Sequence, residues 1–161
     1  MNLLRLINRM HFLSESKRLE LYPPFWLMRI KVIELTNNWQ TVRIKLPLTI
    51  WSRNMGDSIF GGYQASLADP IAALACAKIF PGHSVWTRAM YIDFRREGVT
   101  DLELRFSFST EQENKIREEL QNKGRSTPTF EYGFYLKNGV QCTHILNTVA
   151  IRPKGYKTLR P

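Results

Sequence analysis

The hydrophobic pattern is densest between residues 54 and 80, where a glycine-containing turn leads into one long apolar segment. Apolar side chains fill most of its positions and leave almost no polar face: Ala65, Leu67, Ala68, Ile71, Ala72, Leu74, Ala75, Cys76, Ile79 and Phe80. A helix at a protein surface keeps one polar face. The segment is therefore predicted to form a helix that is buried on most sides, and Pro81-Gly82 fits its end.

Alternating apolar and polar residues predict strands on both sides of this helix. The expected strands cover about residues 28–35, 39–46, 84–94, 102–108, 130–136 and 140–151. Asn37-Asn38 suits a turn between the first two strands, and Asn138-Gly139 is a strong hairpin signal between the last two. Residues 84–94 are apolar on both faces, which predicts a central strand or a strand at a subunit interface.

Two further helices are expected outside the sheet. Residues 1–25 should hold an amino-terminal helix followed by the run Tyr22-Pro23-Pro24-Phe25-Trp26, where helical structure stops because proline cannot donate a backbone N–H. Residues 111–124 should form a short polar helix, with Thr110 and Glu113 as a capping box and Gly124 at its end. The sum is one α+β domain over residues 1–161, a curved antiparallel six-stranded sheet wrapped around the central helix.

The composition fits a folded, soluble protein. Hydrophobic residues make up 43% of the 161 residues, which excludes a disordered chain. Asp69 and Lys78 interrupt the long apolar run before it reaches the roughly 20 residues that a membrane span needs. The first 21 residues spread basic side chains along the segment and lack a small-residue cleavage site, so a docking helix is favoured over a signal peptide.

The cysteines, histidines and charge narrow the range of sites. Cys76 and Cys142 have no CxxC spacing, which predicts buried structural thiols in a reducing compartment, here the cytoplasm. His11, His83 and His144 have no partner at metal-ligand spacing, so no metal site is expected. The net charge of +9 invites an anionic partner, but the basic residues are scattered, so a phosphate-bearing ligand is expected and nucleic acid is not.

One acidic residue interrupts the apolar helix. A carboxylate in such a helix is costly to bury unless it is hydrogen-bonded, neutralised or used in chemistry. Asp69 and Pro70 together fit the start of a second helical piece, because Asp is a favoured N-cap and Pro a favoured first helical residue. The sequence therefore allows either a capping role or a catalytic role for Asp69.

The same stretch carries a recognisable motif. Asn54, Gly56, the run Phe60-Gly61-Gly62 and Asp69 resemble the N-x-x-G-x-x-HGG-x-x-x-x-x-x-D pattern of phenylacetyl-CoA-type acyl-CoA thioesterases, which have the hotdog fold. The spacing from the glycine pair to the acid matches, and Phe60 stands where the pattern has His. The resemblance covers residues from about 20 to 152, and the surroundings of the motif are more similar to a poorly characterised branch of the same superfamily.

The resemblance implies the hydrolysis of an acyl-coenzyme A thioester. Gly61 would donate its backbone N–H to the thioester carbonyl, Asp69 would be the general base or nucleophile, and Asn54 would position the water or the loop. Eight residues span roughly 12 Å along a helix, so one thioester cannot touch both Gly61 and Asp69 of one chain. A homodimer, alone or in a dimer of dimers, is therefore expected to share the site. Coenzyme A would be part of the substrate, and no cofactor is expected.

Further residues are expected to contact the substrate: Phe60, Gly62, Thr87, Arg95 and Arg96. The two arginines would bind the phosphates of coenzyme A. The alternatives are ordinary structural roles: a loop residue at Asn54, close packing at the glycine pair, a β-residue at Thr87 and a solvated strand edge at the arginines. Because the pattern's His is missing, a non-catalytic acyl-CoA or lipid-binding hotdog protein is the second functional hypothesis.

Overall fold

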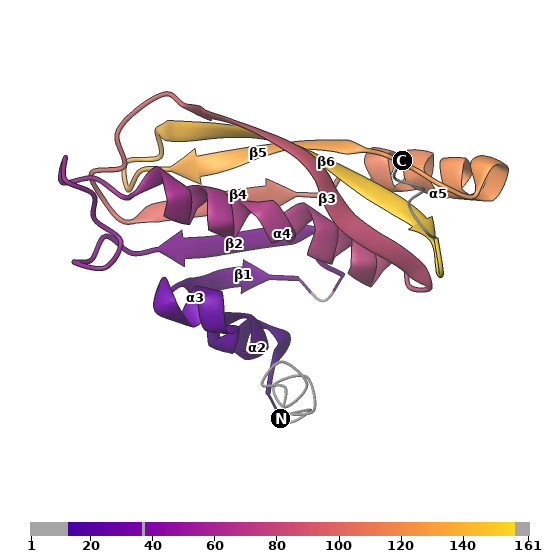
Figure 1. Cartoon of the computed structure of the whole chain (residues 1–161), viewed down its shortest axis with the longest axis horizontal. Coiled ribbons are helices and arrows are strands. Elements are labelled where there is room, and N and C mark those ends of the chain that lie inside the picture. The colour runs from indigo at the N-terminus through magenta and orange to yellow at the C-terminus, as the bar shows by residue number, and fades with distance from the viewer. Residues whose placement is uncertain (1–12, 37, 157–161) are drawn as a thin grey trace.

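Six strands form one antiparallel sheet that curves around a long helix (Figure 1). This computed structural model describes residues 13–36 and 38–156. The strands are β1 (Lys31–Leu35), β2 (Thr41–Leu46), β3 (His83–Phe94), β4 (Leu102–Ser107), β5 (Thr129–Tyr135) and β6 (Gln141–Pro153). They lie in the order β1-β2-β4-β5-β6-β3, and the helix α4 (Gly61–Ile79) follows β2 in the chain. The predicted α+β architecture is confirmed.

The hydrophobic core lies between α4 and the sheet. Alternate residues of β2, β4, β5 and β6 are almost completely buried: Val42, Ile44, Leu46, Leu102, Leu104, Phe106, Phe130, Tyr132, Phe134, Ile145 and Val149. The helix contributes Leu67, Ala68, Ile71, Ala72, Ala75 and Cys76 to the same cluster. The predicted burial of α4 holds for this side only, because the chain leaves a strip exposed at Ser66, Asp69, Leu74 and Ala77.

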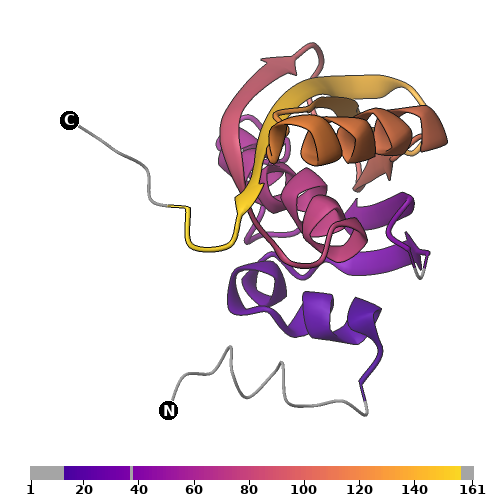
Figure 2. The ribbon, with the colours of Figure 1, turned by 90° about the vertical axis from the view of Figure 1, so that its right-hand side faces the viewer.

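Two short helices precede the sheet, and Figure 2 shows them beside α4. Helix α2 (Glu15–Leu21) docks through Glu15, which accepts a hydrogen bond of 2.7 Å from Trp39 Nε1 and pairs with Lys78 near the end of α4. A docking helix is therefore confirmed for this part of the expected segment. Residues 1–12 of that segment, and Asn37 of the expected turn, lie outside the described residues.

The proline-rich run begins a helix as well as ending one. Helix α3 (Pro23–Leu27) places Pro23 and Pro24 in its first turn, where a missing N–H costs nothing because no intrahelical acceptor exists there. The prediction that helical structure stops at this run is therefore wrong. The strand expected from residue 28 starts later for the same reason, since β1 begins at Lys31.

Helix α5 (Thr110–Lys123) forms the predicted excursion between β4 and β5. Its capping box lies one residue earlier than expected: Ser109 is the N-cap and accepts from the Gln112 N–H at 3.1 Å, and the Gln112 side chain reaches back to the Ser109 N–H. Two overlapping signals compete here, and the serine is used. Gly124 ends the helix with φ +63°, as expected.

Strand β3 lies at one edge of the sheet, so the prediction of a central strand is wrong for the single chain. Its register against β6 shifts between Thr87 and Ala89. Large apolar side chains stay exposed along it, with Trp86 at 37%, Tyr91 at 61% and Phe94 at 52%. The unpaired edge and these side chains leave open the other prediction, a strand at a subunit interface.

Both cysteines are buried and free. Burial raises the pKa of the Cys76 thiol to about 12, so it stays protonated near neutral pH and cannot serve there as a nucleophile. In the part of the chain that the structure covers, no helix combines the length and apolarity required to cross a membrane.

Candidate active site

The amino terminus of α4 presents two backbone N–H groups. Phe60 is the N-cap, and Gly61 and Gly62 are the first two helical residues, which have no intrahelical acceptor. Within residues 13–36 and 38–156, neither glycine N–H donates a hydrogen bond. The Phe60 N–H is held by the Ser52 carbonyl at 2.8 Å, which fixes the entry into the helix. Two oriented donors therefore stand at the positive end of the helix dipole.

Close aromatic neighbours require glycine at both positions. A Cβ on Gly61 would lie 3.0 Å from the ring of Phe94, and a Cβ on Gly62 would lie 2.3 Å from the ring of Phe60. The Phe60 ring is 53% exposed and meets Tyr63 edge-on, with the ring centroids 6.2 Å apart. The structure thus places Phe60, Gly61 and Gly62 together, and close packing explains why side chains are absent while the N–H groups remain available.

Asn54 organises the loop that leads into the helix. Its Oδ1 accepts from the N–H groups of Gly56 at 2.9 Å and Ser58 at 3.2 Å, and its Nδ2 donates to Ser58 Oγ at 3.0 Å. These bonds all stay within residues 54–58. The geometry supports the loop-positioning alternative for Asn54.

Helix α4 continues without a break past Asp69, with Pro70 inside it. The carboxylate of Asp69 is exposed and has no hydrogen bond or ion pair with any described residue. The interpretation of Asp69 as the cap of a second helix is therefore wrong. What remains is an unpaired carboxylate on the exposed strip of α4.

Three strands hold the helix backbone beside this carboxylate. Thr87 Oγ1 on β3 donates to the Asp69 carbonyl at 2.7 Å, and Asn147 Nδ2 on β6 donates to the same oxygen at 3.0 Å. The Tyr132 hydroxyl on β5 donates to the Ala68 carbonyl at 2.8 Å and accepts from Asn147 Nδ2 at 2.9 Å. A proline inside a helix disturbs its hydrogen-bond ladder. These side chains therefore fix the backbone where Pro70 weakens it.

Asn147 and Tyr132 are the residues that sequence reasoning missed. Asn147 is fully buried, and its Oδ1 has no partner among the described residues. Burial raises the pKa of Tyr132, and the nearby Asp69 charge adds to the effect, so its hydroxyl stays a donor. The available signal was a single Asn inside the apolar run 145–151, together with Pro70 in a helical pattern.

The remaining candidates lie at two places along β3. Thr87 is next to Asp69, whereas Arg95 and Arg96 follow Phe94, whose ring contacts the Gly61 position. Both arginines donate their backbone N–H groups to the Cys142 carbonyl, at 2.9 and 3.0 Å, and Arg95 also pairs with Asp93 at 2.8 Å. The structure therefore brings the arginines to the glycine end of the helix and Thr87 to the carboxylate.

The fold and the motif define a protein of the hotdog-fold thioesterase superfamily. Residues 15–149 match a domain of unknown function, DUF4442, and the chain belongs to that family. This agrees with the predicted poorly characterised branch of the superfamily. Among curated protein sequences, none matches this chain significantly.

Solved structures share the fold at low sequence identity. A Pseudomonas aeruginosa protein, PA5026, described as a probable thioesterase, has a TM-score of 0.76 at 16% identity, over 86% of this chain and 93% of that one. The Escherichia coli PaaI protein of the phenylacetic acid degradation operon has a TM-score of 0.60 at 19% identity, over 81% and 85%. A hypothetical thioesterase from Streptococcus pneumoniae, solved with coenzyme A, has a TM-score of 0.57 at 17% identity, over 77% and 86%.

The described residues also bear on metal binding. Nowhere in that part of the chain do three side chains of His, Cys, Asp or Glu gather closely enough to hold a metal ion.

Proposed function

We propose that the protein is a cytoplasmic acyl-CoA thioesterase whose active site is shared between the subunits of a homodimer. The observation that carries this proposal is the pair of available N–H groups at Gly61 and Gly62, followed at the family spacing by the unpaired carboxylate of Asp69. Structural neighbours described as thioesterases, one of them solved with coenzyme A, support the choice of substrate class.

In the proposed reaction, Asp69 acts as general base or as nucleophile. As a base, its carboxylate takes a proton from water while the water oxygen attacks the thioester carbonyl carbon. As a nucleophile, a carboxylate oxygen attacks that carbon, and water then hydrolyses the resulting anhydride. In both routes the Gly61 N–H donates to the carbonyl oxygen as it gains charge, the C–S bond breaks, and coenzyme A leaves as a thiolate that takes up a proton.

A shared site follows from the length of the helix. Gly61 and Asp69 are roughly 12 Å apart along α4, too far for one carbonyl group. Two antiparallel α4 helices related by a two-fold axis would bring the glycine end of one subunit to the carboxylate of the other. The exposed strip of α4 and the unpaired edge of β3, with its exposed Trp86, Tyr91 and Phe94, offer the surfaces for such a dimer.

Two inactive variants are expected to restore activity when they are mixed. In a dimer of a Gly61→Pro chain and an Asp69→Asn chain, one site carries both changes and the other site carries neither. If half of the dimers are mixed, thiol release should return to about one quarter of the wild-type rate. The measurement is release of free thiol from acyl-CoA after mixing, partial unfolding and refolding of the two variants.

Each variant treated alone in the same way is the control, because it contains no intact shared site. Sites formed within single chains would give no recovery, and that result would contradict the shared site even if wild-type hydrolysis is normal. Absence of thiol release by the wild type across a broad acyl-CoA panel would instead overturn the thioesterase itself.

Phe60 decides between the enzyme and the non-catalytic alternative. Its ring covers Gly62 where the thioesterase pattern has a polar His, and this observation favours a protein that binds acyl-CoA without hydrolysing it. Phe60→His is expected to raise kcat by roughly tenfold, because a hydrogen bond to a group that gains charge contributes about 1.5–3 kcal/mol. The fold should survive, since the side chain is 53% exposed.

Phe60→Leu is the control, because it removes the ring without adding a donor. If Phe60→His and Phe60→Leu change kcat equally, position 60 does not touch the reacting group. Tight binding of acyl-CoA by calorimetry without thiol release from wild type or Phe60→His would establish the non-catalytic alternative.

Arg95 and Arg96 are the proposed contacts to the phosphates of coenzyme A. They follow Phe94 at the end of β3, next to the Gly61 end of the helix. Thr87 has a more specific proposed role than substrate contact, because its hydroxyl already donates to the Asp69 carbonyl. Thr87, Asn147 and Tyr132 would act as positioning residues that hold the backbone carrying the carboxylate.

A further inference from the structure

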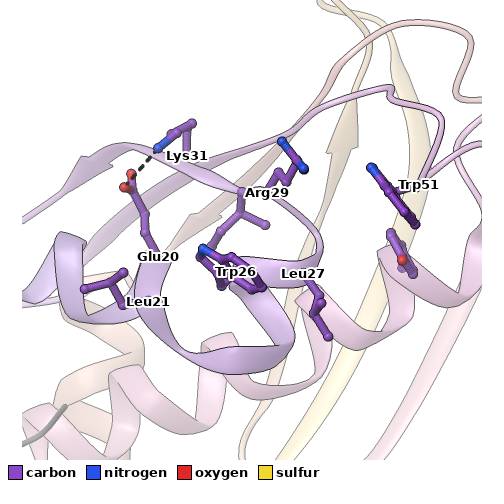
Figure 3. A pocket seen from close by; sticks show the side chains of 9 residues that line it. Glu20, Leu21, Trp26, Leu27, Arg29, Lys31 and Trp51 are labelled. Atoms are coloured by element: carbon purple, nitrogen blue, oxygen red, sulfur yellow. Dashed lines mark hydrogen bonds and ion pairs between the residues drawn. The ribbon is translucent and has the colours of Figure 1, made fainter.

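A second hollow, of about 650 Å³, lies on the opposite flank of α4 from the exposed strip and away from β3 (Figure 3). Its walls come from α2, the α3–β1 segment, the loop after β2 and the first turn of α4. The lining residues are Glu20, Leu21, Trp26, Leu27, Arg29, Ile30, Lys31, Trp51 and Tyr63. The volume is within the roughly 300–1,000 Å³ that is common for small-molecule sites.

The walls of this hollow are largely apolar and aromatic. Trp26 is 60% exposed, Leu27 61% and Trp51 63%, although side chains of this kind are usually buried. Trp26 and Leu27 come from α3, and Trp51 comes from the loop between β2 and α4, so distant parts of the chain present apolar surface to one space. Such a concentration of exposed apolar side chains is typical of a ligand-binding site.

One cation in the hollow is available for a ligand. Glu20 is already engaged, because its Oε1 accepts the Val32 N–H at 3.0 Å and its Oε2 pairs with Lys31 at 3.4 Å and Lys17 at 2.9 Å. Arg29 forms no ion pair with the residues that the structure describes, and it is exposed. The charge in the hollow therefore favours a ligand with a single anionic group.

The backbone at Arg29 would suit glycine better than arginine. Helix α3 ends in a Schellman motif, in which the Arg29 N–H donates to the Trp26 carbonyl at 3.0 Å and the Ile30 N–H donates to the Phe25 carbonyl at 3.3 Å. The residue between them takes a left-handed conformation, with φ +55° at Arg29. Glycine normally fills this position because a side chain is strained there. A strained residue that places an available cation in an apolar hollow points to a role for its side chain.

We infer that this hollow binds a free fatty acid, with its chain against Trp26, Leu27 and Trp51 and its carboxylate on Arg29. A guanidinium can hold a carboxylate with two parallel hydrogen bonds. The aromatic rings offer apolar surface to the chain at little cost in side-chain entropy. The inference concerns free acids and does not depend on hydrolysis at Asp69.

The test is titration of the wild-type protein with decanoate, followed through the indole N–H signals of its four tryptophans in ¹⁵N NMR spectra. The Trp26 and Trp51 signals are expected to shift, whereas those of Trp39, bonded to Glu15, and Trp86, on β3, should not. Arg29→Gln is expected to weaken decanoate binding by about tenfold or more while leaving the weaker binding of neutral decanol unchanged.

Two control variants make the test specific. Arg125→Gln changes the net charge equally at an exposed position outside the hollow and should bind decanoate as the wild type does. Arg29→Gly should bind as weakly as Arg29→Gln, but with a raised Tm, because it removes the backbone strain. This pair separates loss of the cation from loss of the fold.

Several results would overturn the inference. These are the absence of indole shifts with decanoate at millimolar concentration, or equal binding by Arg29→Gln and wild type. Trp26 and Trp51 signals that move with protein concentration instead would assign the surface to a second copy of the chain. Shifts with phosphatidylglycerol vesicles but not with decanoate would assign it to a membrane.

Discussion

Asp69→Asn is expected to lower kcat for acyl-CoA hydrolysis by roughly 10²–10⁴-fold, the usual contribution of a general base. The amide is nearly isosteric with the carboxylate but neither accepts a proton from water at neutral pH nor attacks the thioester. The stability should change by less than about 0.5 kcal/mol, because the carboxylate is exposed and has no hydrogen bond or ion pair with any described residue. Thiol-release kinetics and a thermal melt measure the two quantities.

The matched control is Glu118→Gln on α5, an exposed acid far along the chain from the helix carboxylate. It changes the net charge by the same amount and should leave both kcat and KM unchanged. If Asp69→Asn turns over acyl-CoA as fast as Glu118→Gln does, Asp69 is neither the base nor the nucleophile. A fall in KM alone would point to a role in substrate binding.

The sequence patterns that predicted the fold correctly are those in which local pattern and burial agree. Phe130, Tyr132 and Phe134 alternate with polar residues, and β5 buries these three side chains. Asn138-Gly139 forms the expected turn, with φ +83° at the glycine. The central helix was predictable because its apolar residues leave little choice other than burial against the sheet.

The patterns that misled are those in which one residue serves two structures. A proline pair can end one helix or begin another, and only the docking of α2 and α3 on β1 and α4 decides between them. The apolar faces of β3 indicate burial, but sequence cannot tell a neighbouring strand of the same chain from one of a second chain. β3 lies at the edge of the sheet and keeps Tyr91 exposed.

The candidate site was predictable only in part for a similar reason. The helix start and Asp69 follow from a linear motif, whereas the support of Asp69 comes from β3, β5 and β6 through Thr87, Tyr132 and Asn147. These residues are 18 to 78 positions away from Asp69 or meet it only through the fold. No sequence spacing encodes such a network, so a fully buried Asn was the one available hint.

Gly61→Pro is expected to reduce kcat by roughly 10²–10³-fold, because it deletes the backbone N–H that is proposed to stabilise the carbonyl oxygen. Proline is well tolerated at the first position of a helix, where this N–H has no intrahelical acceptor. The preceding residue must be extended, and Phe60 already has φ −57° and ψ 126°. The fold should therefore persist while one donor is lost.

Gly61→Ala is the control that isolates the donor. Both substitutions add a Cβ that meets the Phe94 ring, at 3.0 Å before any adjustment, but only proline removes the N–H. We expect Gly61→Ala to keep most of the wild-type kcat with a modest fall in Tm, and Gly61→Pro to share that fall while losing activity. Equal kcat values for the two variants would mean that crowding against Phe94, and not the missing hydrogen bond, accounts for the loss, and the Gly61 N–H would then have no role in catalysis.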